Sequence, residues 1–163
     1  MRAVSNTSPI SNLASIGRLD LLKTQLSEIW IPTAVMHELE NHPDPAAVAA
    51  IKSALSQGWI CAIAVSPSPL LNMLRLHLHS GEAEAIALAI DLQADLVLID
   101  EQEGRQYATQ AGLSVSGVLG VLLRAKGNGT IQAIRPELEL LRSKARFFIA
   151  LSLEATVLAA AGE

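Results

Sequence analysis

The sequence predicts an α/β fold in which helices cover both faces of a mostly parallel sheet of four to five strands. Short apolar segments with the period of a strand alternate along the chain with segments of helical length. Helices between successive strands are the usual crossover connections of a parallel sheet. Of the 163 residues, 50% are hydrophobic, enough to give one domain over residues 1–163 a sizeable core.

Five segments are expected to be strands because they are short, contain β-branched residues and lie between turn or helix signals. In chain order they are Arg2–Ser5, Glu28–Ile31, Ile60–Val65, Asp95–Ile99 and Leu113–Val115.

The first helix is expected to begin at Ser8 as its N-cap, with Pro9 at the first helical position, and to run to Ile16 before Gly17. The later helices follow from apolar residues at helical spacing and from their terminating glycine and proline residues. They are Arg18–Leu26, Thr33–Glu40, Pro45–Gln57, Leu70–His79, Glu82–Leu92, Glu103–Ala111, Val118–Lys126, Pro136–Lys144 and Leu153–Ala161.

Composition limits the classes of function. The formal net charge of −4 argues against a strongly basic surface for nucleic acid, and two Trp, one Tyr and two Phe offer little material for stacking bases. Cys61 is the one cysteine, which excludes a disulfide framework and suits a reducing cytoplasm. No apolar stretch has the roughly 18 residues of a membrane span, and no secretion signal is recognisable, so a cytoplasmic location is expected.

Four polar side chains are placed to meet at one edge of the predicted sheet. Asn6 follows the first strand and Asp100 the fourth, and the carboxyl ends of parallel strands share an edge. At about 100° per residue, Glu82 shares a helical face with apolar residues, whereas Glu84 points the opposite way and is expected to be solvated. By the same reasoning Glu38 lies toward the sheet.

A hard divalent cation explains such a cluster most simply. Carboxylates brought together raise one another's pKa unless a proton or cation intervenes. Mg²⁺ or Mn²⁺ prefers oxygen ligands, and none of the four histidines shows a metal-binding pattern. Three carboxylates and one amide favour a single metal before substrate binds, because a bound phosphate would supply the missing negative charge.

Each of these residues also has an ordinary structural interpretation. Asn6 can act as a helix cap, Glu82 as an acidic first-turn residue, and Asp100 as a cap or turn residue. Glu38 can be a solvated charge at a helix end. Near Asp100, Arg105 can hold a substrate phosphate or pair with a neighbouring glutamate, Glu101. The basic run Arg142, Lys144 and Arg146 is interpreted as a solvated helix end, with RNA contact as the alternative.

Taken in order, several segments resemble PIN-domain proteins, and more narrowly the DUF3368 branch of VapC-like proteins. These are Asn6–Pro9, Ile31–Pro32 leading to Val35–Leu39, Gly81–Ala89, Leu98–Glu101 through Gly104–Arg105, and Gly117–Gly120 through Ala125–Lys126. The resemblance thins out in the C-terminal helices. It implies a compact three-layer α/β/α sandwich, a magnesium-dependent ribonuclease, a homodimer and a small antitoxin partner encoded next door.

The resemblance also assigns site residues. Glu38, Glu82 and Asp100 match the family's second, third and fourth acidic positions, and Asn6 stands where PIN nucleases generally carry aspartate. An amide oxygen can coordinate a metal, but the site loses a negative charge and metal affinity should fall. Around this metal and catalytic set, Thr7 and Ser8 would orient Asn6 or a metal-bound water. Arg105 would contact substrate, and the roles of Glu84, Glu101 and Glu103 remain open.

Three functional classes follow. The first is a metal-dependent endoribonuclease, the toxin of a type II toxin–antitoxin pair, acting on RNA. The second is a weakened PIN fold that binds RNA or a partner protein without cleaving it, motivated by Asn6. The third is a magnesium-dependent phosphohydrolase acting on smaller substrates. The leucine-rich segment Leu70–Leu78 carries apolar residues on more than one helical face, as does the last helix, which predicts a two-fold symmetric dimer.

Overall fold

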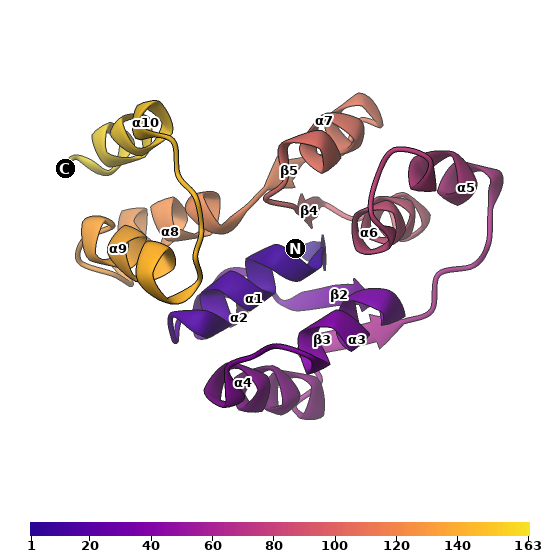
Figure 1. The fold of residues 1–163 in the computed structure, drawn as a ribbon, viewed down its shortest axis with the longest axis horizontal. Coiled ribbons are helices and arrows are strands. Elements are labelled where there is room, and N and C mark those ends of the chain that lie inside the picture. Colours follow the sequence, from indigo (N-terminus) through magenta and orange to yellow (C-terminus); the bar gives the residue numbers. More distant parts are fainter.

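A computed structural model describes all 163 residues and contains one sheet of five strands, all parallel, in the order β3-β2-β1-β4-β5 (Figure 1). The strands are β1 (Arg2–Ser5), β2 (Glu28–Pro32), β3 (Ile60–Ile63), β4 (Leu96–Leu98) and β5 (Val115–Ser116). The order places β1 at the centre. From β1 the chain builds outward to β3, then crosses to the other side of β1 for β4 and β5.

Ten helices connect and cover these strands. They are α1 (Thr7–Ser15), α2 (Asp20–Gln25), α3 (Thr33–Glu40), α4 (Pro45–Ser56), α5 (Pro69–Arg75), α6 (Ser80–Asp91), α7 (Gln102–Gln110), α8 (Val118–Gly127), α9 (Arg135–Lys144) and α10 (Leu151–Ala161). None of them combines the length and the apolar character that a membrane crossing needs.

Side chains that alternate along the strands separate two cores, as the period of two requires. On one face, Ala3 of β1 and Leu98 of β4 belong to a cluster of 30 buried residues that includes parts of α1, α2, α4, α8 and α9. On the other face, Val4 and Val97 belong to a cluster of 13 buried residues with parts of α5, α6 and α7. The predicted α/β sandwich with a mostly parallel sheet is therefore confirmed.

Several predicted boundaries were wrong, and the largest error is in the helix expected over Leu70–His79, which ends at Arg75. The first helix begins at Thr7, so Ser8 lies inside it and does not cap it. The third strand stops at Ile63 rather than Val65, because its partner Pro32 is the last residue of β2 and α3 begins directly after it. The fifth strand is shifted toward Ser116, where it pairs with Val97 and Leu98 of β4.

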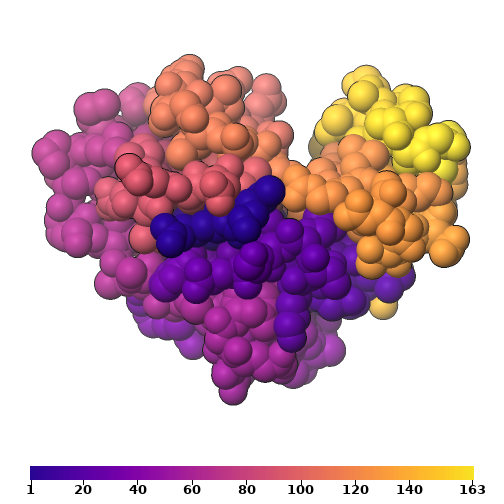
Figure 2. Space-filling view, turned by 180° about the vertical axis from the view of Figure 1, so that it is seen from behind, coloured from indigo at the N-terminus to yellow at the C-terminus, as the bar shows by residue number.

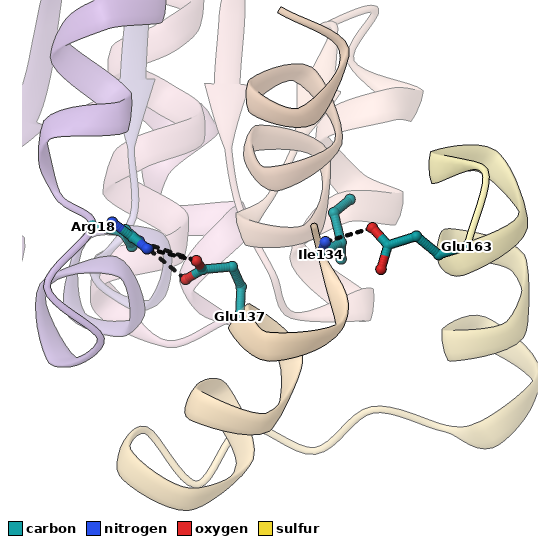
Figure 3. Close-up of polar contacts among 4 residues, drawn as sticks. All are labelled: Arg18, Ile134, Glu137 and Glu163. Carbon is teal, nitrogen blue, oxygen red and sulfur yellow. Dashed lines mark hydrogen bonds and ion pairs between the residues drawn. The ribbon is translucent and has the colours of Figure 1, made fainter. Parts of the chain in front are cut away.

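Polar contacts attach the C-terminal helices to this framework (Figure 3). The guanidinium group of Arg18, just after α1, donates three hydrogen bonds of 2.8–3.2 Å to the buried carboxylate of Glu137 on α9. At the end of α10, Gly162 adopts φ 74°, a left-handed conformation that glycine accepts readily. This turn directs Glu163 back to the amide of Ile134 at the start of α9, at 2.6 Å, which lowers the pKa of Glu163.

We expect Arg18→Ala to lower the free energy of unfolding by about 2 kcal/mol, because it leaves the Glu137 carboxylate buried without a partner. The cost falls below that of a fully buried pair since the Arg18 side chain is 43% exposed. Urea unfolding at pH 7 measures it. Arg142→Ala is the matched control: its pair with Glu154 lies at the surface, and little change is expected. Equal effects of the two variants would contradict the assignment.

Candidate active site

Asn6 stands at the end of the central strand and anchors the candidate site. Its backbone N–H donates to the Leu98 carbonyl at 2.9 Å, which extends the β1–β4 pairing by one residue. Asn6 is 4% exposed and occupies the N-cap position of α1, as expected, but its side chain makes no capping hydrogen bond. Instead Nδ2 donates to Oε2 of Glu101 at 3.1 Å, and Oδ1 faces Gly81. The amide therefore presents its oxygen away from Glu101.

Glu101 connects three elements at this edge. Besides the bond from Asn6, its Oε1 accepts a hydrogen bond of 2.5 Å from Ser8 on α1. Its charge also contributes to the raised pKa of Glu82 and of Asp100. The role of Glu101 could not be predicted from the sequence. Its partners Ser8 and Asn6 lie 93 and 95 positions away in the chain, and no local pattern indicates such distant contacts.

Glu38 reaches the same edge from α3. Its Oε2 accepts a hydrogen bond of 2.5 Å from Thr7, so the exposed carboxylate is anchored rather than free at a helix end. A Cβ atom at Gly81 would lie 3.0 Å from Asn6 Oδ1 and 3.2 Å from Glu38 Oε1. Gly81 therefore lets the amide and carboxylate oxygens approach the first turn of α6 closely.

Glu82 and Glu84 have different environments, as helical phase predicts. Glu82 is 7% exposed, and burial, followed by the charge of Glu101, raises its pKa, while His79 and its backbone amide oppose the shift. Glu82, Glu101 and Glu103 line one cavity of about 490 Å³. Glu84 points away and pairs with Arg75 at 2.8 Å, so the expectation that Glu84 is simply solvated was wrong.

Asp100 is held by hydrogen bonds at both of its oxygens. Oδ1 accepts from the Val118 N–H at 2.8 Å, and Oδ2 accepts from Asn12 at 3.3 Å. Burial raises the pKa of Asp100 to about 6, and Glu101 adds to the shift, against the lowering effect of these donors. Gly117 allows the arrangement, because a Cβ atom there would collide with Oδ1. Asn12 escaped the sequence analysis although it lies on the polar face of α1, one turn after Ser8.

Arg105 lies beside Asp100 without pairing to Glu101. Its Nη1 donates to the Ile99 carbonyl at 2.8 Å, and no ion pair with a carboxylate forms. Both Arg105 and Asp100 line a second, largely apolar cavity of about 710 Å³ beside α8 and α10. The alternative in which Arg105 pairs with Glu101 is therefore wrong, and its remaining N–H groups are available to an anion.

The side chains leave the site divided into two groups. Asn6, Glu38, Glu82 and Glu101 surround the start of α6, while Asp100 is turned toward Asn12 and α8. No three His, Cys, Asp or Glu side chains are gathered closely enough to hold one metal ion among them. The chemistry of the donors nevertheless fits a hard divalent cation, because they are oxygen atoms and because the neighbouring carboxylates Glu82 and Glu101 form no ion pair with a cation.

A family model described as DUF3368: PIN domain matches residues 2–163, which includes the C-terminal helices. The chain belongs to the PIN-domain family. PIN domains are generally nucleases and typically use divalent metal ions. Among solved structures, the chain is similar to a PilT N-terminus domain protein from the hyperthermophilic archaeon Sulfolobus solfataricus P2, with a TM-score of 0.53 and 22% identity. That match covers 77% of this PIN-domain chain and 93% of the archaeal one, and it supports the fold. No curated protein matches the chain.

We expect Asp100→Asn to stabilise the chain at pH 7 in the absence of divalent cations and to lose this advantage toward pH 4. The folded-state pKa of about 6 lies above the ordinary value of 3.8, so the folded protein binds this proton more tightly than the unfolded chain does. The stability linked to Asp100 is therefore full below about pH 4 and is lost as the pH rises through about 6. The difference is on the order of 2–3 kcal/mol at pH 7.

Urea unfolding in EDTA between pH 4 and pH 8 measures this dependence, with the exposed residue Asp91→Asn as the control. Parallel stability profiles for the parent and for Asp100→Asn would contradict it.

Proposed function

We propose that this PIN-domain chain is a metal-dependent endoribonuclease, the toxin of a type II toxin–antitoxin pair, which hydrolyses RNA phosphodiesters with Mg²⁺ or Mn²⁺. The observation that carries the proposal is the buried carboxylate of Glu82 next to Glu101 and Asn6 at the carboxyl edge of the central strands. In open parallel sheets, ligands bind where the strand order reverses, and Asn6 and Asp100 lie on either side of that point.

The proposed metal ligands are Asn6, Glu38 and Glu82 beside the start of α6, together with Asp100, whose carboxylate would have to turn from Asn12 and Val118 toward them on metal binding. A bound divalent cation would lower the pKa of a water molecule and polarise a phosphoryl oxygen. Thr7 positions Glu38 through its hydroxyl group, and the bond from Asn6 to Glu101 directs the amide oxygen toward the start of α6.

Other residues serve the substrate. Arg105 keeps one N–H bonded to the Ile99 carbonyl, which orients its guanidinium group for a phosphate beside Asp100. Ser8 reaches the site edge through its bond to Glu101. Glu103 lines the cavity that contains Glu82 and Glu101, where it can hold a water molecule bound to the metal.

A second candidate function is supported by the amide of Asn6. Because Nδ2 donates to Glu101, this position stabilises the carboxylate without a cation, which suits a chain that binds RNA or a partner protein and does not cleave. Aspartate at position 6 has no N–H for Glu101, so two carboxylates would face each other at about 3 Å unless a cation lay between them. The substitution therefore separates the two functions.

We expect the parent to cleave fluorescent RNA with Mn²⁺ or Mg²⁺ and Asp100→Asn to abolish cleavage. We expect Asn6→Asp to cleave about tenfold faster, to melt at a lower temperature in EDTA, and to gain more in melting temperature on metal addition. The matched control is Glu84→Gln, a carboxylate of the same helix as Glu82 that pairs with Arg75, and it should cleave like the parent.

The RNA set contains structured and unstructured molecules. Absence of cleavage by both the parent and Asn6→Asp rejects the nuclease proposal and leaves the binding function. Hydrolysis of mononucleotide phosphates in place of RNA would instead select a phosphohydrolase acting on small substrates.

The proposal includes a homodimer, a small antitoxin partner and a cytoplasmic location. Met73 on α5, Leu76 directly after α5, Phe148 before α10, and Leu151 on α10 are 65–87% exposed, which supports association through apolar surface. A cytoplasmic location fits Cys61, which is free. A short reading frame encoding a small protein beside this gene would support the antitoxin.

We expect light scattering of the purified chain at micromolar concentration to give the mass of a dimer. Met73→Glu with Leu76→Glu should shift the mass toward the monomer if α5 forms the contact, because the charges would be buried in the interface. Phe148→Glu with Leu151→Glu is the matched test of the other surface. A monomeric parent would contradict the dimer.

A further inference from the structure

Helix α1 carries an uncharged polar face that begins at the candidate active site. Its buried residues include Ile10 and Leu13, and the less buried face is formed by Thr7, Ser8, Ser11, Asn12 and Ser15. Three members of this face bond the carboxylates of the site: Thr7 to Glu38, Ser8 to Glu101 and Asn12 to Asp100. The other two, Ser11 and Ser15, lie further along the helix and are not explained by the site.

Ser11 and Ser15 line a polar cavity of about 490 Å³ with His42, Lys144 and Arg146. The hydrogen bonds define the state of the histidine. Its Nδ1 accepts from the Asp44 N–H at 3.0 Å, so Nε2 carries the proton and donates to the Ser15 hydroxyl at 2.9 Å. Ser15 in turn donates to the Ser11 carbonyl. This wall of the cavity is therefore ordered and neutral, while Lys144 and Arg146 provide its positive charge.

The basic run at the end of α9 divides into two parts. Arg142 is paired with Glu154, whereas Lys144 and Arg146 form no ion pair. Asp44 also lines the cavity: its Oδ1 accepts the Ala46 N–H at the start of α4, so this one carboxylate is held in place and the two cations outnumber it. Lys144 and Arg146 thus line one cavity with the hydroxyl groups of α1, and Arg146 also borders the neighbouring pocket that contains Arg142.

Arg146 adopts φ 52°, a left-handed conformation directly after α9. Glycine takes that position at helix ends without strain. The Arg18–Glu137 pair holds the first turn of α9 next to the end of α1 (Figure 3). Lys144, at the end of α9, lines the same cavity as Ser11 and Ser15.

We propose that Lys144 and Arg146, with Ser11 and Ser15, form a phosphate-binding subsite for the RNA strand whose scissile phosphate lies at the carboxylate edge. The inference rests on the proposed ribonuclease function and extends it to how the strand lies on the protein. Seven residues of helix separate Ser8 from Ser15, about 10.5 Å at 1.5 Å per residue. The subsite therefore holds a phosphate of the same strand that is distinct from the scissile phosphate.

The test compares two double variants that remove the same charge. Lys144→Gln with Arg146→Gly removes the subsite, and the glycine relieves the left-handed backbone so that folding is preserved. Lys52→Gln with Arg124→Gln removes two exposed cations that form no ion pair on α4 and α8. Both double variants are made in the Asp100→Asn chain, so that the RNA is not cut during the measurement. Binding of a fluorescein-labelled 12-nucleotide oligouridylate is followed by fluorescence anisotropy in the presence of Mn²⁺. The NaCl concentration is varied from about 25 to about 300 mM, a range over which phosphate contacts are lost.

We expect the subsite variant to bind at least fivefold more weakly at low salt and to lower the slope of log K against log salt by about 0.7, the value for one phosphate contact on a single strand. The control variant should keep the parent slope. Equal slopes in the two variants, or no RNA binding by the parent at low salt, overturn the subsite. If RNA binds with the expected slopes but the parent chain, which retains Asp100, does not cleave RNA, the nuclease proposal alone is rejected. If the parent cleaves RNA and the Lys144→Gln with Arg146→Gly variant cleaves it at the same rate, the subsite alone is rejected.

Discussion

The parallel direction of all five strands is the constraint on which the rest of the structure depends. Parallel strands bring their carboxyl ends to one edge, and every connection must then cross a face of the sheet as a helix. Because β1 lies at the centre, with β2 on one side and β4 on the other, Asn6 and Asp100 end neighbouring strands at the point where the chain changes direction. The helices that follow these strands begin at the same edge, which is why α1 and α7 both supply polar groups to it.

At this edge the carboxylates are hydrogen-bonded by uncharged side chains and not by cations. The acidic groups are bonded by neutral donors: Thr7 to Glu38, Ser8 and Asn6 to Glu101, and Asn12 to Asp100. Arg105, the nearest cation to Asp100, directs its hydrogen bond to a backbone carbonyl. Neutral donors stabilise carboxylates without cancelling their charge. The edge thus retains the negative potential that attracts a divalent cation, while the free cations of α9 lie further along α1.

Much of the fold can be read from the sequence, because its signals are local. Strand-length apolar runs and helix-ending glycines located every element, and helical phase alone separated Glu82 from Glu84. The boundaries that were wrong depend on neighbours. The third strand, β3, ends where β2 has no further residue to pair with, and Ser8 lies inside α1, where its hydroxyl group bonds Glu101 of another element.

The hydrogen bonds within the site could not be predicted from the sequence, because they join residues that are far apart in the chain. Bonds such as Asn12 to Asp100 join residues 88 positions apart, and the need for Gly81 and Gly117 arises from side chains of other elements. Local patterns carry no record of such contacts. The position of α10 at one corner of the molecule against α8, visible in yellow in Figure 2, likewise depends on packing and on the bond from Glu163.

The pairing of β1 with β4 determines when the carboxylate edge can form during synthesis of the chain. Ala3 pairs with Leu96, so one edge of the central strand stays open until more than half of the chain has left the ribosome. Asp100 then still requires the amide of Val118 and the adjoining glycine, which are made later. A nascent chain therefore carries Asn6 and Glu38 early but cannot assemble a complete edge until α8 emerges, so the site forms only when about three quarters of the chain has been made.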